Sequence, residues 1–586
     1  MFFVYTFLLL LLKCILFYGF MLDPTHTSIP LYETLYHSAF RLQYYSAFIL
    51  IFLSFALLMK KRLAIWYLVV FNVCLTGFLL MDLWYARGFN TLPTVHLLGQ
   101  ASNLNNLSGS ILVLIRFIDC LFILDLLVIF YMSWRKKELL NTERTGFKTF
   151  VSALVASSLV LGYIPVSSAF FNQKDSKAIF KMFDPIITSY NLSPIGYHIM
   201  DAYYYIKDSR PLELSQAEKD EISAWFAKKQ EHLPDNKYKG LFKGKNLIVI
   251  QVESLENFVL QRKFHEQEVT PTLNRLLENS LYFSNYLEQV NEGTTSDAEY
   301  MTNTSVYPLR HGSTFFRYPY NHYNSLPKLL GKRGYRTFSV HPDEGSYWNW
   351  AQAHKSIGFQ HTYDATKFDR SEIFGMGISD GTLLRQTVPI MKETKQPFYS
   401  FIVTASSHSP YEIPEKYQEL KFSDSFNRSS LGRYLQSIHY ADKQIGLLLQ
   451  QLEKENILKN SVIVIYGDHE GIHKYFGGDM KEYPVYHNGK RVPLIIYHPS
   501  LQAEEYKLTG GQIDLMPTLA YLMGVEEAEY QHTAMGRNLL KTNKSFAVLT
   551  SGKYVGETIQ EPQQQMLQQG LVIADKIIKS NYFKEY

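Results

Sequence analysis

The sequence contains few cysteines and no run of basic residues. Only three of its 586 residues are cysteine, Cys14, Cys74 and Cys120, and all three lie in apolar segments where we expect them to be packing residues. The chain after Cys120 cannot form a disulfide, so a domain there would not depend on oxidative cross-linking. The net charge is only +4, and no Lys/Arg stripe stands out, which argues against a nucleic-acid partner.

The hydrophobic residues are distributed very unevenly along the chain. The mean hydropathy of −0.12 is that of a soluble protein, yet the segment 1–170 is far more apolar than the rest. Five stretches in it approach the length of about 20 residues that a helix needs to cross a bilayer, at 2–22, 43–59, 63–83, 111–133 and 149–167. We therefore predict a five-helix transmembrane domain at 1–170, and the 15 % aromatic content fits such an anchor.

Basic residues between the apolar stretches predict the orientation of this domain. Lys60-Lys61-Arg62 separates the second stretch from the third, and Trp134-Arg135-Lys136-Lys137 follows the fourth. Both connections lie in the cytoplasm if the N-terminus does, as the positive-inside rule requires. Five crossings then make the protein a multi-pass cell-membrane protein with its remaining residues extracellular. Four later stretches argue that the first is a retained anchor and not a cleaved signal peptide.

Charged residues occur inside the predicted third and fourth spans. Arg116, Asp119 and Asp125 lie in the fourth, and Asp82 lies near the end of the third. Charges in lipid are costly and invite a functional interpretation. The alternative, which we favour, is an Arg116–Asp119 pair one helical turn apart that faces other helices.

Beyond the spans the pattern changes to short strands alternating with helices. We predict a linker with helices at 171–244, including one that begins after Ser215, and a catalytic domain at 245–545 with a C-terminal tail, 546–586, packed on it. Within the domain, apolar runs at 246–253, 335–341, 398–404 and 461–467 indicate strands, and helices are expected after Thr270 and over 433–456. This alternation predicts an α/β domain with a central, mostly parallel sheet.

Each of these four strands ends in, or just before, a side chain that can bind a metal or move a proton. They are followed by Glu253, His341, His408 and the pair Asp468-His469. Open α/β sheets bind ligands beyond the carboxyl ends of their strands. Two carboxylates and an imidazole, Glu253, Asp468 and His469, suit a divalent cation such as Mn²⁺, Mg²⁺ or Zn²⁺.

A candidate nucleophile lies in a loop that enters a helix, Gly293–Glu299. A hydroxyl at a helix N-terminus, such as that of Thr295, can act beside backbone N–H groups that hold a phosphate. Thr295 and Ser296 are equally well explained as helix N-caps. Composition alone does not choose between these two interpretations.

Six motifs in order resemble the lipoteichoic acid synthase family, phosphoglycerol transferases of the alkaline-phosphatase/sulfatase-like superfamily. They are Val252–Leu255, Gly293–Glu299, His341 with Asp343 and Trp348-Asn349, Ser407–Pro410, Tyr466–Gly471 and Gly511–Thr518. The resemblance covers both the membrane anchor and the domain, and it implies an anchor followed by a sulfatase-like fold.

The resemblance also implies a reaction and a set of site residues. Mn²⁺ would be held by Glu253, Thr295, Asp468 and His469. Thr295 would attack the phosphorus of phosphatidylglycerol, release diacylglycerol and carry a glycerophosphoryl group to a glycolipid or a growing polyglycerolphosphate chain. His408 would contact the phosphate or handle a proton, and His341, Asp343 and Trp348 would line the glycerol-phosphate pocket.

One position departs from the family pattern, and two alternatives remain. Trp350 stands where many members have an arginine that would grip phosphate, which leaves the substrate open. A phosphoethanolamine-type or other phospho-group transferase is one alternative, although those enzymes carry disulfides in the outer domain. A non-catalytic membrane scaffold is the other. A sulfatase is disfavoured because Thr295 lacks the Cys/Ser-x-Pro-x-Arg context.

Overall fold

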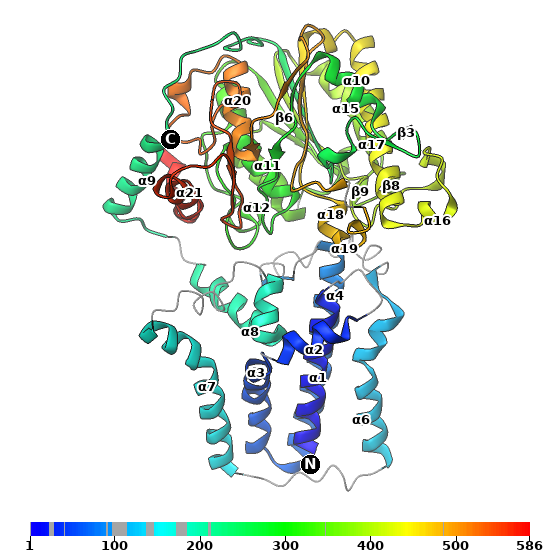
Figure 1. Ribbon diagram of the computed structural model, residues 1–586, viewed down its shortest axis with the longest axis vertical. Helices are drawn as coiled ribbons and strands as arrows, with labels where there is room; N and C mark the ends of the chain where they lie inside the picture. Colours follow the sequence, from blue (N-terminus) through cyan, green and yellow to red (C-terminus); the bar gives the residue numbers. More distant parts are fainter. Residues whose placement is uncertain are drawn as a thin grey trace. The chain divides into compact units, whose positions relative to one another are not determined.

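The computed structural model describes residues 2–22, 29–39, 41–89, 92–95, 114–135, 146–171, 185–208, 212–345, 347–483 and 486–585 (Figure 1). The chain divides into two compact units, Met1–Ser209 and Arg210–Tyr586. The predicted boundaries at 170, 244 and 545 remain predictions.

Apolar helices make up the first unit. α1 (Phe2–Leu22), α4 (Lys61–Phe89) and α7 (Gly146–Phe171) each contain a stretch long and apolar enough to cross a membrane. A fourth crossing is possible if α2 (Leu31–Ala39) and the helical segment Leu42–Leu58, which meet at 73°, form one broken span. The predicted fourth span consists of a 3₁₀ turn, η3 (Phe117–Phe122), and α6 (Leu124–Arg135), while 111–113 lie outside the described residues. The described residues thus give three or four spans, and the count of five remains a prediction.

Three buried acidic residues in this unit pair with basic residues on other helices. The ion pairs are Asp119 with Arg87 (2.7 Å), Asp125 with Lys13 (2.7 Å), and Asp82 with His198 of α8 (Pro185–Asp208; 2.9 Å). Asp119 also accepts the backbone N–H of Arg116. The predicted ion pair of Arg116 with Asp119 is therefore wrong, and the partner of Asp119 is Arg87 on another helix. A buried charge is stabilised by the opposite charge that helix packing brings close to it.

A central eight-stranded sheet organises the second unit, as the sequence predicts. Its order is β13 (Glu504–Tyr506), β4 (Ser280–Phe283), β12 (Leu494–Tyr497), β11 (Ser461–Gly467), β1 (Asn246–Val252), β10 (Phe398–Val403), β6 (Arg336–Val340) and β7 (His361–Tyr363). The five strands from β11 to β7 run parallel to one another, and β12 lies antiparallel to both of its neighbours. The prediction of a mostly parallel sheet is confirmed.

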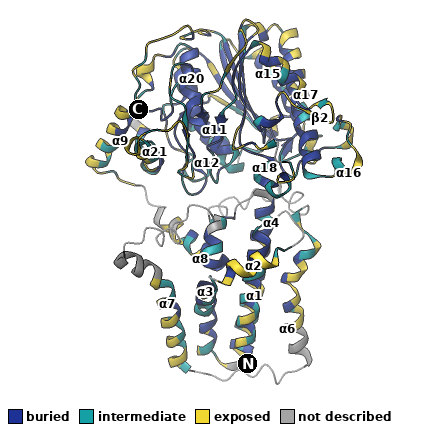
Figure 2. Cartoon of the chain, viewed as in Figure 1, coloured by how far each residue is buried: buried dark blue, intermediate teal, exposed yellow. Residues whose placement is uncertain are grey.

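Both faces of the sheet are buried, because side chains alternate along each strand. Ile248 and Ile250 of β1 pack with α10 (Pro271–Leu276), α15 (Asp380–Glu393) and α17 (Ser430–Lys454). Leu247 and Val249 pack on the other side with α11 (Thr295–Thr304), α13 (Leu326–Gly331), α14 (Trp350–Ile357) and α20 (Leu515–Leu522). The central strands β1, β10 and β11 and the helix α11 are accordingly among the most buried elements (Figure 2).

Two more helices pack against the second of these faces. α9 (Gln216–Lys229) begins after Ser215, whose backbone N–H and side chain exchange hydrogen bonds with Glu218 in a capping box. α21 (Glu561–Ser580) accepts a hydrogen bond from Trp225 of α9 at the carbonyl of Met566. Its Asp575 pairs with Arg310 at 2.8 Å, so polar as well as apolar contacts hold this helix to the rest of the second unit.

Candidate active site

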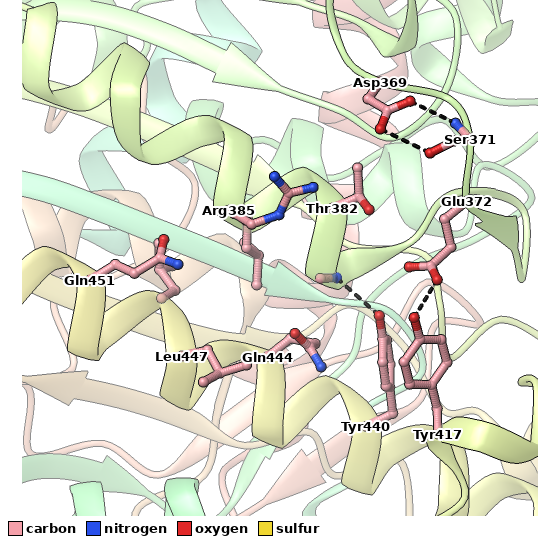
Figure 3. A pocket seen from close by; sticks show the side chains of 13 residues that line it. Asp369, Ser371, Glu372, Thr382, Arg385, Tyr417, Tyr440, Gln444, Leu447 and Gln451 are labelled. Carbon is pink, nitrogen blue, oxygen red and sulfur yellow. Dashed lines mark hydrogen bonds between the residues drawn. The ribbon is translucent and has the colours of Figure 1, made fainter.

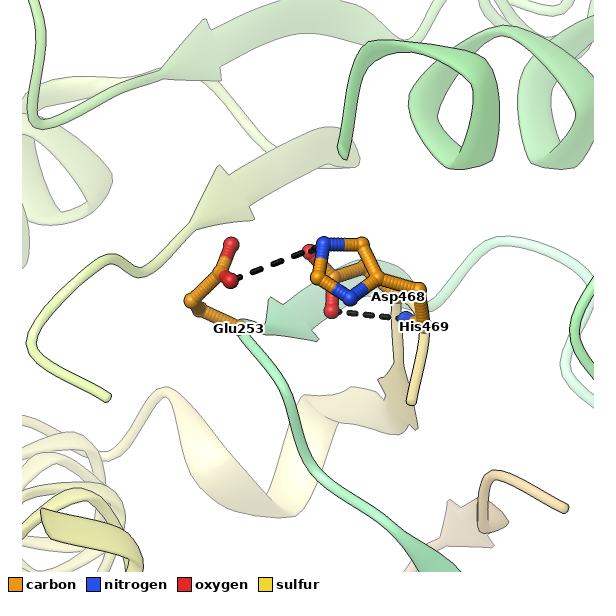
Figure 4. Close-up of side chains that lie close together, drawn as sticks. All are labelled: Glu253, Asp468 and His469. Atoms are coloured by element: carbon orange, nitrogen blue, oxygen red, sulfur yellow. Dashed lines mark hydrogen bonds and ion pairs between the residues drawn. The ribbon is translucent and has the colours of Figure 1, made fainter. Parts of the chain in front are cut away.

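Two adjacent strands bring the predicted metal-binding residues together. β1 ends at Val252, directly opposite Gly467 at the end of β11, so Glu253 and the pair Asp468-His469 emerge side by side (Figure 4). One ligand atom from each of the three residues lies within 4.8 Å of the others. All three side chains are buried, with at most 2 % of their residue surface exposed. We call Glu253, Asp468 and His469 the metal set.

The contacts around the metal set suit a divalent cation. Asp468 Oδ1 accepts the N–H groups of Ser254 and His469, whereas its buried Oδ2 has no hydrogen-bond partner among the described residues. His469 Nδ1 lies 2.8 Å from the carbonyl of Glu470, which leaves Nε2 facing Glu253 Oε1 at 3.6 Å and Asp468 Oδ2 at 3.5 Å. A carbonyl partner on the second ring nitrogen is the arrangement that metal-binding histidines usually have.

The electrostatics of the metal set agree with its geometry. Burial and the negative charge of Glu253 raise the pKa of Asp468 well above its usual value. Burial, and then the charge of Lys474, lower the pKa of His469 to about 4, so its imidazole is neutral as a metal ligand must be. Two ionised carboxylates buried side by side repel each other, and either a proton or a cation between them removes that repulsion. The residues present therefore fit a divalent metal.

Thr295 is the first residue of α11, and its hydroxyl points to the metal set. Its Oγ1 donates a hydrogen bond to Glu253 Oε2 at 3.1 Å, and the residue is only half-buried. The N-cap position belongs to Thr294, which has a positive φ of 44°. The interpretation of Thr295 as an N-cap is wrong, because its hydroxyl donates to Glu253, 42 residues earlier in the chain, and does not accept a backbone N–H of α11.

Asp297 shapes the loop in front of Thr295. One of its oxygens accepts the N–H groups of Asn291 and Gly293, at 3.0 and 2.9 Å. A Cβ on Gly293 would lie 2.2 Å from the Asp297 carboxylate, so only glycine fits there. The glycine and the aspartate of this motif therefore set the backbone that presents Thr295, a role that their spacing of four residues alone does not reveal.

His341 and Asp343 follow β6 and lie together. His341 Nδ1 is 3.5 Å from Asp343 Oδ2, and Nε2 is 3.6 Å from Glu299 Oε1 on α11. Burial alone would lower the pKa of His341, but the hydrogen bond and charge of Glu299 outweigh it and raise the pKa. Trp348 lies in the same loop with a φ of 52°, half-buried, and packs edge-on against Phe316.

His408 completes the group from the loop after β10. Its Nδ1 lies 2.7 Å from the carbonyl of Ser409. Its ring is 6.4 Å from that of Tyr475, which is 6.2 Å from the ring of His469. Because β11, β1, β10 and β6 are consecutive in the sheet, all four predicted strand ends meet at one edge.

Glu299 is a site residue whose role the sequence does not indicate. It is buried on α11, one helical turn after Thr295, and lies 2.9 Å from His354 Nε2 in addition to its contact with His341. The i, i+4 spacing from Thr295 places both residues on one helix face. That spacing, and the place of Glu299 at the end of the motif Gly293–Glu299, link this residue to the site in the sequence.

A separate cavity of about 390 Å³ lies between α15 and α17 (Figure 3). Part of its polar lining is paired within the protein: Glu372 bonds with Tyr417, and Asp369 with Ser371. None of the metal set, Thr295, His341 or His408 lines it. The cavity therefore holds no part of the predicted catalytic group.

Comparisons with known proteins agree with the fold and the motifs. The family model described as the lipoteichoic acid synthase N-terminal domain matches residues 1–213, and the sulfatase model matches 245–525. Lipoteichoic acid synthase 1 of Bacillus subtilis is 30 % identical over 496 residues, which cover 82 % of this chain and 76 % of that protein. Lipoteichoic acid synthase of Staphylococcus aureus is 29 % identical over 493 residues, with 82 % and 75 % covered. The chain belongs to the lipoteichoic acid synthase family.

A solved structure of the same family extends the comparison to the fold. The lipoteichoic acid synthase LtaP from Listeria monocytogenes matches with a TM-score of 0.56 and 26 % identity, over 61 % of this chain and 98 % of that one. The predicted family, and with it an enzyme with a sulfatase-like domain, is confirmed. The N-terminal match and the apolar helices make the chain a membrane protein.

The residue that departs from the family pattern has a packing role. Trp350 is 1 % exposed at the start of α14, and its ring stacks on His341 with centroids 4.6 Å apart. Its Nε1 donates to the carbonyl of Glu344 at 3.0 Å. In this member of the lipoteichoic acid synthase family, the side chain of Trp350 therefore packs against the ring of His341 and holds it in place.

Proposed function

We propose that the protein transfers glycerol phosphate from phosphatidylglycerol to a glycolipid or a growing polyglycerolphosphate chain, through a covalent glycerophosphoryl group on Thr295. The observation that carries the proposal is the hydrogen bond from the Thr295 hydroxyl to Glu253 within the buried metal set. The names of the curated relatives support lipoteichoic acid synthesis as the process.

In the first half of the reaction Thr295 Oγ1 attacks the phosphorus of the lipid. The hydroxyl proton leaves toward Glu253 Oε2, to which it already points. The bond between phosphorus and the diacylglycerol oxygen breaks, and His408 supplies the proton that this oxygen needs. Diacylglycerol departs, and the glycerophosphoryl group remains on Thr295.

The second half reverses these roles. A hydroxyl of the acceptor gives its proton to His408 and attacks the same phosphorus. The bond to Thr295 breaks, and the threonine oxygen recovers its proton from Glu253. Each half is a single exchange of oxygen at phosphorus, so no oxidant or further reactant is needed.

A divalent cation fits the metal set together with Thr295. We propose Mn²⁺, with Mg²⁺ or Zn²⁺ as alternatives for the mixed oxygen and nitrogen ligands Glu253, Thr295, Asp468 and His469. When bound, such a cation lowers the pKa of a coordinated hydroxyl and neutralises charge on phosphoryl oxygens.

The loop after β6 would bind the transferred group. His341, whose pKa Glu299 raises, offers positive charge to a phosphate, and Asp343 and Trp348 offer a carboxylate and an aromatic edge to the glycerol. Binding here keeps phosphorus next to Thr295 through both halves of the reaction.

The membrane unit would hold the protein in the leaflet that supplies its substrate. With a cytoplasmic N-terminus, the basic segments around 60–62 and 134–137 lie inside and the catalytic unit lies outside the cell. Phosphatidylglycerol and the glycolipid acceptor are then both membrane partners.

The test uses the full chain, purified in detergent, with Mn²⁺ and labelled phosphatidylglycerol. Native protein should release diacylglycerol, and removal of the metal with a chelator should stop the release. Thr295→Ala should abolish it, and the native peptide containing Thr295, but not the variant peptide, should gain glycerophosphate in mass spectrometry.

Thr304→Val provides a matched control. Thr304 lies on the same helix, and its buried hydroxyl bonds back to the carbonyl of Tyr300, so the variant loses a helical threonine hydroxyl away from the metal set. It should retain native turnover. Equal release from native protein and Thr295→Ala would refute the threonine intermediate, and no release from the native protein would point to another head group.

A further inference from the structure

The loops that carry the metal set remain in contact beyond it. Ser254 donates its N–H to Asp468 Oδ1 at 2.7 Å and its hydroxyl to Glu253 Oε1 at 2.8 Å. A Cβ on Gly471 would lie 2.7 Å from Ser254 Cβ, so the two chains approach as closely as glycine allows. The positions of Asp468 and His469 thus depend on how the loop after β11 is held against the loop after β1.

A buried carboxylate holds that second loop. Glu256, three residues after Glu253, is fully buried. Its Oε1 accepts the N–H groups of Gly471 at 2.8 Å and His473 at 3.0 Å, and its Oε2 bonds with His473 Nδ1. We call Glu256, Gly471 and His473 the clasp. It closes on backbone groups only two and four residues beyond His469.

The carboxylate of the clasp is itself held in place. The backbone N–H of Glu256 donates to the hydroxyl of Tyr434 on α17, and that hydroxyl donates to the carbonyl of Ser254. The ring of Phe258 packs edge-on against the imidazole of His473, with centroids 5.3 Å apart. Glu256 is therefore held in place in the loop after β1, and its carboxylate binds the loop after β11.

The same region could be interpreted as a second cation site. One ligand atom each of Glu256, Glu470 and His473 lies within 4.8 Å of the others. However, both oxygens of Glu256 already accept donors of the clasp, and Glu470 Oε1 accepts the N–H of Lys490 at 2.7 Å and the side chain of Asn488 at 3.2 Å. These oxygens already have hydrogen-bond donors from the protein, so the contacts favour a carboxylate that binds the loop after β11 over one that binds a cation.

We propose that Glu256 is a positioning residue: it fixes the loop 468–473 so that Asp468 and His469 face Glu253 at the distances that a metal requires. The proposal rests on the metal set of the proposed function but not on the identity of the transferred group. Mutating a residue that orients metal ligands without binding the metal commonly lowers the metal affinity by a factor of about 10 to 100.

The test measures Mn²⁺ binding to the full chain in detergent from the electron paramagnetic resonance signal of the free ion. Glu256→Ala removes the acceptor of both backbone N–H groups and should weaken binding about 10-fold to 100-fold. Glu256→Gln keeps one carbonyl oxygen for these groups and should weaken it less. His473→Ala leaves the carboxylate and both backbone bonds intact, so it should have the smallest effect of the three.

Asp442→Asn is the matched control. Asp442 is an equally buried carboxylate that accepts two backbone N–H groups, those of Thr272 and Leu273, at the start of α10. The control variant should lower the melting temperature as the Glu256 variants do, yet bind Mn²⁺ with native affinity. If Glu256→Ala fails to fold, Glu256→Gln and His473→Ala decide the question.

Four results would overturn the proposal, and three of them are specific to it. The first is native Mn²⁺ affinity in the Glu256 variants, and the second is an equal loss in Asp442→Asn. The third is a native protein that binds two Mn²⁺ ions, of which Glu256→Ala loses one and retains the other at native affinity. Absence of any divalent-ion binding would overturn the metal set and this proposal together. If the native protein and the variants bind Mn²⁺ as expected but the native protein does not turn over phosphatidylglycerol, only the proposed function is refuted.

Discussion

Replacing Glu299 tests whether a buried carboxylate supports both the fold and the substrate site. Glu299 is 1 % exposed and lies between His354 Nε2, at 2.9 Å, and His341 Nε2, at 3.6 Å. Glu299→Gln retains the shape of the side chain and removes its charge. The two histidines then lose the negative charge that they face, in a place without access to water.

The expected cost follows from the pKa of Glu299. Burial alone would raise this pKa, but the hydrogen bonds and charges of His341 and His354 outweigh burial and lower it from 4.5 to about 2. That difference corresponds to roughly 3 kcal/mol of stabilisation at neutral pH. Because the pKa is lowered in the folded state, the stabilisation is present above about pH 4.5 and is lost as the pH falls toward about 2.

The assay is thermal unfolding of the full chain in detergent from about pH 2 to about pH 8, which spans this window. Glu299→Gln should melt several degrees lower at neutral pH, and the gap should narrow toward acid. It should also raise the KM for phosphatidylglycerol, because His341 loses its partner. Glu278→Gln, at an exposed position, is the control. Parallel melting curves for native protein and Glu299→Gln at every pH would refute the reasoning.

Two further variants test packing in the two units. Trp350→Arg puts a charge in place of a buried ring that stacks on His341 and should cost about 3 kcal/mol or more in stability and lower activity; an unchanged melting temperature with a lower KM would contradict the packing role. Lys13→Met leaves Asp125 without its 2.7 Å partner and should cost about 3 to 5 kcal/mol, whereas Lys13→Met with Asp125→Leu should cost less; equal melting of the single and double variants would contradict this.

The sequence predicts the strands and their functional ends well, because both signals are local. Apolar runs that end in Glu253, His341, His408 and Asp468 are buried strands, and the parallel sheet brings their carboxyl ends to one edge. The topology predicted from alternating strands and helices then suffices to bring the metal set together. No contact between distant residues had to be known in advance.

The sequence does not predict which residues the individual side chains contact. Whether Thr295 caps its helix or faces Glu253 depends on the approach of α11 to β1, which no spacing within 293–299 reports. The ion pair of Asp119 with Arg87 is missed for the same reason, since a helical turn predicts neighbours within a helix and not between helices. The clasp at Glu256 joins residues 215 or more positions apart and leaves no local pattern.

The contacts of the site separate the metal set from the loop that we propose binds the substrate. The metal set is held by Ser254 and the clasp, on the loops after β1 and β11, whereas Trp350 acts on His341 in the loop after β6. A change at position 350 can therefore alter the pocket wall without moving Glu253 or Asp468. If this chain prefers another head group or acceptor than its relatives, the preference should arise from the loop after β6. The metal affinity should then stay the same, and Thr295 should remain the nucleophile that we propose.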